Sequence, residues 1–228
     1  MLAILYDVHG NRPALEAVLD DARAAGADRI VLGGDYSAFG AWPVDCVDAL
    51  RALGDGTTWI RGNWERWQAE PDAVPDVPVI QGAATWVREQ LGPELIAELA
   101  ALPASAVVDD TLFVHGSPLS DIEPFGPEPD PEGDDQALAG VAQRRVVFGH
   151  SHLQFTRTTP GGTCLVNPGS VGLPWDGDAR AAYALLADDG TIELRRVDYD
   201  LEAAATAVEA IGEPWATATA ERLRTARF

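Results

Sequence analysis

Residues 1–11 of the chain read Met-Leu-Ala-Ile-Leu-Tyr-Asp-Val-His-Gly-Asn, a short apolar run that ends in polar and ionisable side chains. A helical pattern follows over residues 13–25, with Pro13 in the first turn and apolar residues at helical spacing. A similar strand, loop and helix occupy residues 29–53, and residues 57–65 begin a third such unit. This alternation predicts βαβ units and a parallel sheet in the first third of the chain.

The rest of the chain has a different pattern. Turn residues between apolar runs predict three hairpins, centred on residues 109–111, 161–162 and 188–190. Helical spacing covers residues 86–102, where Pro93 is expected to cause a break. Residues 119–135 are rich in proline and acidic side chains and are expected to form a surface loop or a lid. We expect a single domain over residues 1–228 that ends in an alanine-rich helical tail over residues 201–228.

Acidic residues outnumber basic residues by 36 to 16, which gives the 228-residue chain a formal net charge of -20. Because Lys and Arg supply most of the affinity for phosphate backbones, this charge argues against nucleic-acid polymers and anionic membranes as partners. All 16 basic residues are arginine, which excludes a Schiff-base lysine and a P-loop lysine. No apolar run approaches the roughly 20 residues that span a bilayer, and residues 1–11 lack the basic start of a signal peptide. We therefore expect a cytoplasmic protein, and the sequence leaves its oligomeric state open.

All four histidines follow predicted strands, and so do two aspartates and one asparagine. These candidate metal ligands are Asp7, His9, Asp35, Asn63, His115, His150 and His152. In an open α/β sheet the strand ends share one edge, so the seven side chains should converge there. For each of these residues alone, a structural role is the more common explanation. If all of them had only structural roles, however, the position of every histidine at a strand end would be a coincidence. Seven nitrogen and oxygen donors are too many for one octahedral ion and suit two ions that share a carboxylate.

Five short motifs stand in a fixed order: Asp7-x-His9, Gly34-Asp35, Gly62-Asn63, His115-Gly116 and Gly149-His150-x-His152. This order resembles the calcineurin-like metallophosphoesterase superfamily. Residues 167–172 and 176–180 resemble its small bacterial branch, which includes diadenosine-tetraphosphate hydrolases and phosphodiesterases. The resemblance implies an α/β fold, a four-layer α/β/β/α sandwich of two mixed β-sheets flanked by helices.

The resemblance also implies how the ligands are shared between two divalent metal ions. The first ion would be held by Asp7, His9 and His152, and the second by Asn63, His115 and His150. Asp35 would bridge the two ions, and a hydroxide between them would attack phosphorus. Mixed histidine, carboxylate and amide ligands favour Mn or Fe, with Zn as a third option. On this basis Asp35, Asn63 and Arg61 are the expected catalytic residues.

The implied function is hydrolysis of phosphoester or phosphoanhydride bonds by a dinuclear phosphodiesterase or nucleotide polyphosphate hydrolase. Its partner would be a small phosphorylated substrate, with nucleotides among the candidates. The sequence departs from the family at Trp64, which stands after Gly62-Asn63 where the family usually has histidine. Because an indole cannot act as a general acid, we expect substrates with good leaving groups. A phosphomonoesterase and a non-catalytic metal-binding scaffold on the same fold are the alternatives.

Five residues are candidates for substrate binding: Asn11, Arg61, Trp64, Trp175 and Arg180. Each arginine would either contact a phosphate or form a salt bridge within the protein. Each tryptophan would either stack on a nucleobase or pack in the interior. Asn11 would either contact phosphate or cap the helix that follows it, and capping is the stronger expectation.

Overall fold

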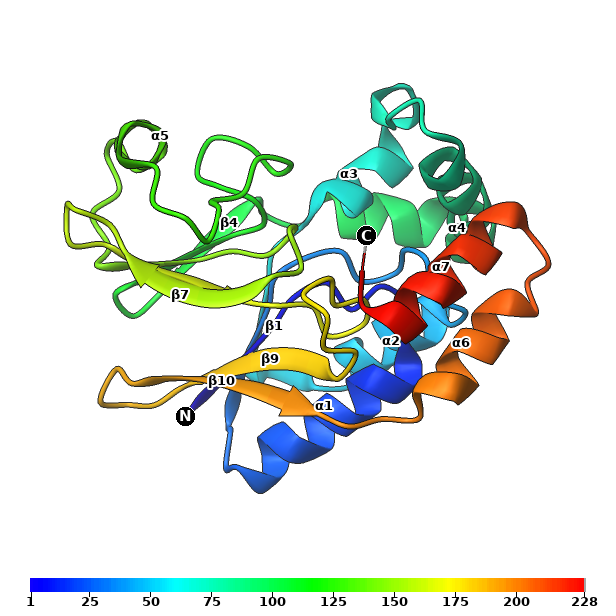
Figure 1. The fold of residues 1–228 in the computed structure, drawn as a ribbon, viewed down its shortest axis with the longest axis horizontal. Coiled ribbons are helices and arrows are strands. Elements are labelled where there is room, and N and C mark those ends of the chain that lie inside the picture. Colours follow the sequence, from blue (N-terminus) through cyan, green and yellow to red (C-terminus); the bar gives the residue numbers. More distant parts are fainter. Residues whose placement is uncertain (228) are drawn as a thin grey trace.

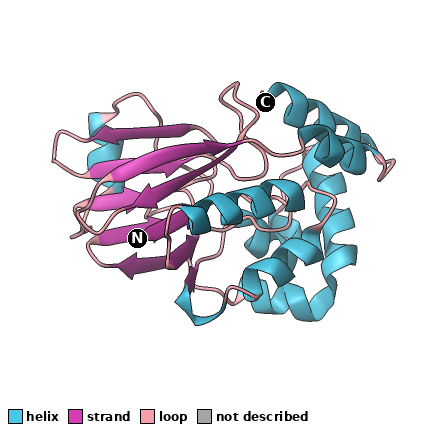
Figure 2. Cartoon of the chain, turned by 90° about the horizontal axis from the view of Figure 1, so that it is seen from below, coloured by secondary structure: helices cyan, strands magenta, loops and turns pink. Residues whose placement is uncertain are grey.

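The computed structural model describes residues 1–227, in which two five-stranded sheets pack face to face (Figures 1 and 2). The first sheet has the strand order β10-β9-β1-β2-β3. Its strands are β1 (Leu2–Leu5), β2 (Arg29–Leu32), β3 (Thr57–Trp59), β9 (Ala181–Leu186) and β10 (Ile192–Val197). Strands β1, β2 and β3 run parallel, whereas β9 pairs antiparallel with both β1 and β10. The parallel sheet predicted for the first third of the chain is confirmed.

The second sheet has the strand order β4-β5-β6-β8-β7. Its strands are β4 (Ser105–Val108), β5 (Thr111–Val114), β6 (Arg145–Val147), β7 (Gln154–Thr158) and β8 (Cys164–Pro168). Strands β5, β6 and β8 run parallel, and the two outer strands are antiparallel to their neighbours. The three predicted hairpins are confirmed as β4–β5, β7–β8 and β9–β10.

Seven α-helices lie within the described residues: α1 (Arg12–Ala24), α2 (Pro43–Arg51), α3 (Asn63–Ala69), α4 (Pro78–Ala100), α5 (Pro131–Ala137), α6 (Leu201–Glu209) and α7 (Pro214–Thr225). Helix α4 starts before the predicted residue 86, and it is kinked at Gly92, whose φ of 68° is not helical. The kink immediately precedes Pro93, so the predicted break is confirmed. None of the helices in the described part of the chain has the length and apolar character needed to cross a membrane.

Strand β1 shows how the sheets are covered. Leu2 and Ile4 face the second sheet and join Phe113 in the core between the sheets. Ala3 and Leu5 point the other way and pack in the core shared with α1, α2 and α4. Because alternate side chains point to opposite faces and both faces are covered, the whole strand is apolar. Helix α5 lies on the outer face of the second sheet, and the predicted four-layer sandwich is confirmed.

Helices α3, α4, α6 and α7 gather beside the sheets, on the right in Figure 1. They share an apolar cluster that includes Trp64, Trp67, Trp215 and Leu223. Helices α6 and α7 form the tail that was predicted to be helical, with its break at Pro214. Within the tail, α7 packs against α4, and α6 packs against α1.

Residues 119–135 run irregularly as far as Asp130 and then enter α5. The Asp130 carboxylate caps this helix by accepting a hydrogen bond from a backbone N–H in its first turn. Two contacts anchor the irregular part. Asp121 accepts two hydrogen bonds of 2.7 Å from Arg66 of α3, and Phe125 is buried against the second sheet. The segment expected to be a loop to residue 135 thus ends in a helix.

Candidate metal centre

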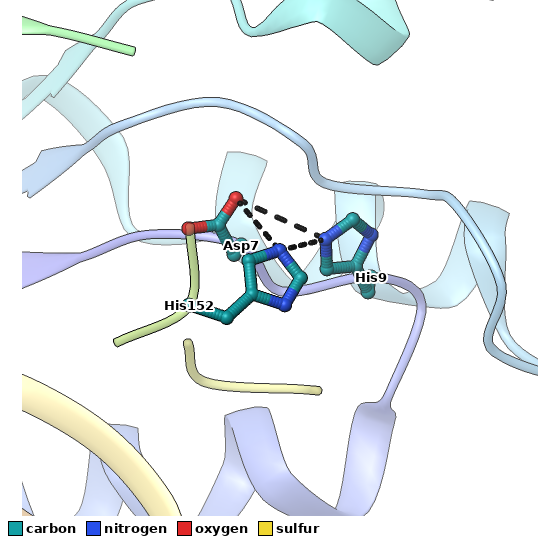
Figure 3. Close-up of side chains that lie close together, drawn as sticks. All are labelled: Asp7, His9 and His152. Atoms are coloured by element: carbon teal, nitrogen blue, oxygen red, sulfur yellow. Dashed lines mark hydrogen bonds and ion pairs between the residues drawn. The ribbon is translucent and has the colours of Figure 1, made fainter. Parts of the chain in front are cut away.

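The seven predicted ligands lie in loops that follow strands of both sheets. Asp7 and His9 follow β1, Asp35 follows β2, Asn63 follows β3, His115 follows β5, and His150 and His152 follow β6. His150 is partly buried and the other six are buried. Side chains of Asp7, His9 and His152 point toward one another, although the two histidines are 143 positions apart in the chain (Figure 3). The structure thus brings together side chains that follow five separate strands.

The first ligand group consists of Asp7, His9 and His152, whose ligand atoms lie within 4.8 Å of one another. Asp7 Oδ1 is 3.5 Å from His152 Nε2 and 3.8 Å from His9 Nε2. The two imidazole Nε2 atoms are 3.0 Å apart. Three donor atoms on three side chains therefore point at one small volume, as Figure 3 shows.

The second ligand group consists of Asp35, His115 and His150, which meet the same distance limit. The Asn63 amide belongs beside this group, because its Oδ1 is 2.8 Å from His150 Nδ1. Asp35 Oδ2 lies 3.3 Å from His115 Nε2 and 3.9 Å from His9 Nε2 of the first group. The Asp35 carboxylate therefore lies between the two groups.

Backbone carbonyl groups orient two of the histidines. His115 Nδ1 lies 2.8 Å from the Gly33 carbonyl oxygen, and His152 Nδ1 lies 2.6 Å from that of Leu173. Because a carbonyl oxygen can only accept, Nδ1 carries the proton in both rings. In the neutral rings Nε2 then presents its lone pair to the centre, the arrangement typical of metal-binding histidines.

Three of the predicted ligands have a buried atom that forms no hydrogen bond within the described part of the chain: Asp7 Oδ1, His9 Nδ1 and His115 Nε2. Of these, Asp7 Oδ1 and His115 Nε2 lie close to other ionisable groups. Their nearest ionisable partners are 3.5 Å and 3.3 Å away. A buried polar atom without a hydrogen bond is costly, and binding of a cation at Asp7 Oδ1 would remove that cost. The donors are imidazole nitrogen, carboxylate oxygen and amide oxygen, a set that fits divalent metal ions.

Burial and mutual charge shift the ionisation of these groups. Burial lowers the pKa of His9 well below its usual value and that of His150 to about 4, so both rings are neutral. Burial also acts to lower the pKa of His115, but the Asp35 and Asp7 carboxylates outweigh it and raise this pKa to about 10. Burial acts to raise the pKa of Asp7 and Asp35, yet the neighbouring histidines keep both pKa values lowered. Metal binding would therefore release the His115 proton.

Five of the predicted ligands have a left-handed backbone conformation, with φ between 49° and 63°: Asp7, His9, Asp35, His150 and His152. L-residues other than Asn and Asp rarely adopt this conformation, and they keep it only where the surrounding structure enforces it. Gly62 is part of that surrounding structure, because a Cβ atom there would lie 2.1 Å from Asp35 Oδ1. The tight turns at the strand ends therefore aim the side chains inward.

Glu65 is a buried residue of the centre that the sequence prediction missed. Its carboxylate accepts hydrogen bonds from the backbone N–H groups of Gly62 at 2.7 Å, Asp35 at 2.9 Å and Tyr36 at 2.9 Å. Glu65 therefore ties the loop that carries Asp35 to the turn that carries Asn63. Burial and the Asp35 charge raise the pKa of Glu65 to about 7. One feature of the sequence could have identified Glu65. It stands three residues after Gly62, which is the spacing of a capping box at the start of a helix.

A cavity of about 360 Å³ lies next to both ligand groups. One part of its lining, here called the polar edge, consists of His9, Asp35, Asn63, His150 and His152. The other part, here called the apolar wall, consists of Phe39, Trp64, Trp67, Pro75, Val77, Val79, Ile80, Ile122 and Trp175. Arg222 of α7 completes the lining. A ligand in this cavity would contact candidate metal ligands and large apolar side chains at once.

Two of the predicted substrate-binding residues, Trp64 and Trp175, line this cavity. Trp64 is only 3% exposed, and its ring packs edge-on against Phe39 and Trp67. Trp175 stacks on His152, with ring centroids 3.9 Å apart. Both tryptophans therefore have packing roles within the protein as well as a place in the lining.

The other three candidates do not line the cavity. Asn11 caps α1 by accepting a hydrogen bond of 3.2 Å from a backbone N–H, which confirms the capping interpretation. Arg61 donates to the Ala100 carbonyl oxygen at 3.2 Å. Arg180 forms a surface ion pair of 2.6 Å with Asp178. For Arg61 and Arg180 the structure thus shows contacts within the protein, and sequence alone could not distinguish these from phosphate contacts.

Comparisons with known proteins agree with this geometry. The family model of the calcineurin-like phosphoesterase superfamily domain matches residues 1–190, which include both ligand groups. The uncharacterized protein MJ0912 of Methanocaldococcus jannaschii is 28% identical over 226 residues, covering 90% of this chain and 90% of that protein.

Two solved structures extend the likeness to the whole chain. A metallophosphoesterase from Sphaerobacter thermophilus has a TM-score of 0.81 and 27% sequence identity, with 99% of each chain covered. A hypothetical protein from Pyrococcus horikoshii has a TM-score of 0.86 and 20% identity, with 98% of each chain covered, and shows a common fold. The chain therefore belongs to the calcineurin-like phosphoesterase superfamily, whose members are metal-dependent.

Proposed function

We propose that the protein is a dinuclear metal-dependent phosphodiesterase or nucleotide polyphosphate hydrolase. The observation that carries this proposal is the pair of adjoining ligand groups with the Asp35 carboxylate between them. Two groups with a shared carboxylate suit two ions better than one. The mixed ligand set favours Mn or Fe, with Zn as a third option.

Each ion has a defined set of ligands in this proposal. The first would be held by Asp7, His9 and His152, the second by Asn63, His115 and His150, and Asp35 would bridge them. When bound, the two ions supply positive charge for the phosphate oxygens and lower the pKa of water to near neutrality. The chain orients these ligands itself, through the carbonyl groups that face His115 and His152 and through Glu65 behind Asp35. Local positive charge matters here because the chain has a net charge of -20.

The apolar wall supports a substrate with an aromatic group beyond the scissile phosphate. Trp175, the least buried of its tryptophans, lies in the same lining as the polar edge, within reach of one bound molecule. Stacking of a base on an aromatic side chain contributes about 1–3 kcal/mol and depends little on the identity of the base. We therefore propose a small phosphorylated substrate that carries a nucleobase or another aromatic group.

Trp64 restricts the leaving group. It directly follows Asn63, and its indole N–H cannot donate a proton at neutral pH. The imidazole groups in the polar edge are assigned to metal ions, so the lining offers no general acid for an alkoxide leaving group. Phosphoanhydrides and aryl esters, which leave as weaker bases, are therefore the favoured substrates.

Hydrolysis of bis-p-nitrophenyl phosphate tests the proposal. We expect turnover that requires Mn²⁺, stops with a chelator and falls by at least about a hundredfold in Asp35→Asn, because the variant removes the bridging charge. A thermal melt of Asp35→Asn controls for unfolding. An alkyl phosphomonoester should be hydrolysed far more slowly than the aryl diester.

Each contrary outcome has its own meaning. Absence of turnover in protein that binds two Mn²⁺ ions would contradict the phosphodiesterase activity. Absence of both turnover and metal binding would leave a non-catalytic scaffold as the function. Equal rates for the alkyl monoester and the aryl diester would contradict the role assigned to Trp64.

A further inference from the structure

We infer that Ile122 determines substrate specificity by covering the aromatic group of a bound substrate, and that the ion pair between Arg66 and Asp121 positions it. This inference rests on the proposed function and assigns part of its substrate recognition to the segment 119–135. Ile122 belongs to the apolar wall of the cavity, yet it is 46% exposed. Trp64 and Trp67 of the same wall are only 3% and 6% exposed. Ile122 therefore lies at the open side of the cavity, where a bound ligand would bury it.

A second apolar side chain is exposed at the same cavity. A single exposed apolar residue is ordinary in a folded protein. The large apolar side chains that are exposed in the described part of the chain are Val77, Val107, Leu119 and Ile122. Val77 and Ile122 both line the cavity, although they come from different segments of the chain. Because apolar surface that a ligand covers adds to its affinity, the two side chains favour an apolar or planar group at this end of the substrate.

An ion pair of the preceding residue holds Ile122 in place. Arg66 donates two hydrogen bonds of 2.7 Å to the two carboxylate oxygens of Asp121. The two side chains are only 22% and 26% exposed, so solvent screens this paired contact less than it screens a surface ion pair. Arg66 lies in α3, the helix that begins at Asn63. The ion pair therefore fixes Ile122 relative to a helix that carries a candidate metal ligand.

The segment is also fixed on both sides of Ile122. In the turn over residues 117–120, the first backbone N–H donates to the last carbonyl oxygen at 2.7 Å. A Cβ atom at Gly116 would lie 2.5 Å from that oxygen, so the turn packs directly on the residue that follows His115. On the other side, Phe125 is buried against the second sheet. An apolar side chain that is exposed on a fixed backbone is preorganised to contact a ligand.

Binding of two phosphonates to Mn²⁺-treated protein, measured by isothermal titration calorimetry, tests the role of Ile122 without turnover. Methylphosphonate and 2-naphthylphosphonate present the same charged group to the candidate metal centre, but only the naphthyl compound has fused rings like those of a purine base. We expect wild type to bind the naphthyl compound at least about tenfold more tightly. In Ile122→Ala this preference should fall by about three- to tenfold, while the affinity for methylphosphonate changes by less than about twofold.

Leu119→Ala is the matched control for Ile122→Ala. It removes an exposed apolar side chain from the same segment, but one that does not line the cavity, so it should change neither affinity.

Arg66→Met tests the positioning role, because it keeps the apolar stem and removes the donors of the ion pair. The preference for the naphthyl compound should fall by at least about threefold. Since Arg66 acts through Ile122, the double variant Arg66→Met/Ile122→Ala should lose no more of the preference than Ile122→Ala alone. Losses that multiply in the double variant would overturn the positioning role.

The outcomes separate this inference from the proposed function. An unchanged preference in Ile122→Ala, or equal binding of both compounds by wild type, overturns the role of Ile122. If wild type does not hydrolyse the aryl diester but its preference for the naphthyl compound depends on Ile122, the proposed function fails and the role of Ile122 in binding stands. If wild type hydrolyses the aryl diester and Ile122→Ala leaves the preference unchanged, the proposed function stands and this inference fails.

Discussion

The polar edge and the apolar wall enclose one cavity but are fixed in different ways. Residues of the polar edge stand in turns at strand ends, where backbone hydrogen bonds to Glu65 and left-handed conformations hold them. Residues of the apolar wall come from the loop after β2, from α3, from α4 and the segment before it, from the segment 119–135 and from the loop around Trp175. Most of them are held by side-chain packing. Main-chain geometry tolerates little change, whereas packed apolar surfaces accept substitutions of similar volume. Under the proposed function, the reaction class and the choice of substrate would therefore be encoded in separate parts of the molecule.

Trp64→His changes a residue that belongs to both sides of the comparison. Trp64 directly follows Asn63 of the polar edge, and its own ring belongs to the apolar wall. An imidazole there supplies a general acid, so the rate for an alkyl diester relative to an aryl diester should rise by about a hundredfold. Loss of the buried indole should lower the free energy of unfolding by about 3 kcal/mol. Steady-state rates and urea denaturation measure the two effects.

Trp64→Phe is the matched control for Trp64→His. It keeps an aromatic ring in the apolar wall but provides no acid, so it should leave the ratio of the two rates unchanged. If the rate for the alkyl diester relative to the aryl diester rises equally in both variants, then the size of the side chain at position 64, and not the lack of a proton donor, limits hydrolysis of the alkyl diester.

Glu65→Gln tests the polar edge without changing a ligand. The variant keeps the shape of the side chain but turns an amide N–H₂ toward backbone N–H groups. We expect a loss of about 2 kcal/mol in the free energy of unfolding and at least a tenfold weaker affinity for Mn²⁺. Urea denaturation and calorimetric titration measure these changes. Glu70→Gln, an exposed residue at the end of the same helix, should change neither, and wild-type affinity in Glu65→Gln would refute the positioning role.

Asp21→Asn gives a reference for an ordinary polar contact outside both parts of the lining. Asp21 of α1 accepts hydrogen bonds from Arg195 at 2.8 Å and 3.0 Å and from the Tyr183 hydroxyl at 2.5 Å. The variant should lower the free energy of unfolding at pH 7 by about 1 kcal/mol and leave phosphoesterase activity unchanged.

The effect of Asp21→Asn should depend on pH. The hydrogen bonds from Arg195 lower the pKa of Asp21 in the folded state. The stabilisation is therefore complete above the unfolded pKa of about 3.9 and is lost as the pH falls through the folded pKa. Urea denaturation at pH 7 and at about pH 3 should show a smaller difference between wild type and variant at the lower pH. A difference that grows on acidification would contradict the assignment.

The polar edge was largely predictable from sequence, and the apolar wall was not. Asp7 and His9 directly follow an apolar run, and strand ends of parallel sheets must meet, so their position followed from local pattern and topology. Ile122 and Arg222 lie in segments without a motif, and only tertiary packing brings them to the cavity. Glu65 stood next to a recognised motif, but its role depends on a loop 30 positions earlier in the chain.

Arginine was the hardest residue type to interpret. The chain contains 16 arginines, and the sequence gives no means of telling which guanidinium group meets a carboxylate and which meets a substrate. Arg180 was a candidate for either a phosphate contact or a salt bridge, and the structure shows the salt bridge, with Asp178 two residues away. Arg222 stands in no motif, and its place in the cavity depends on how α7 packs on α4 and α6.

The left-handed backbone at Asp7, His9, Asp35, His150 and His152 sets the proposed catalysis against thermostability. Each L-residue in this conformation costs roughly 1–2 kcal/mol relative to its preferred conformations, with a smaller penalty for aspartate. Glycine adopts the same conformation without that penalty. Laboratory evolution for heat resistance alone should therefore replace the histidines among these five positions with glycine and gain stability as the metal ligands disappear. Retaining both properties would require stabilising substitutions elsewhere, in the helices and the sheet core.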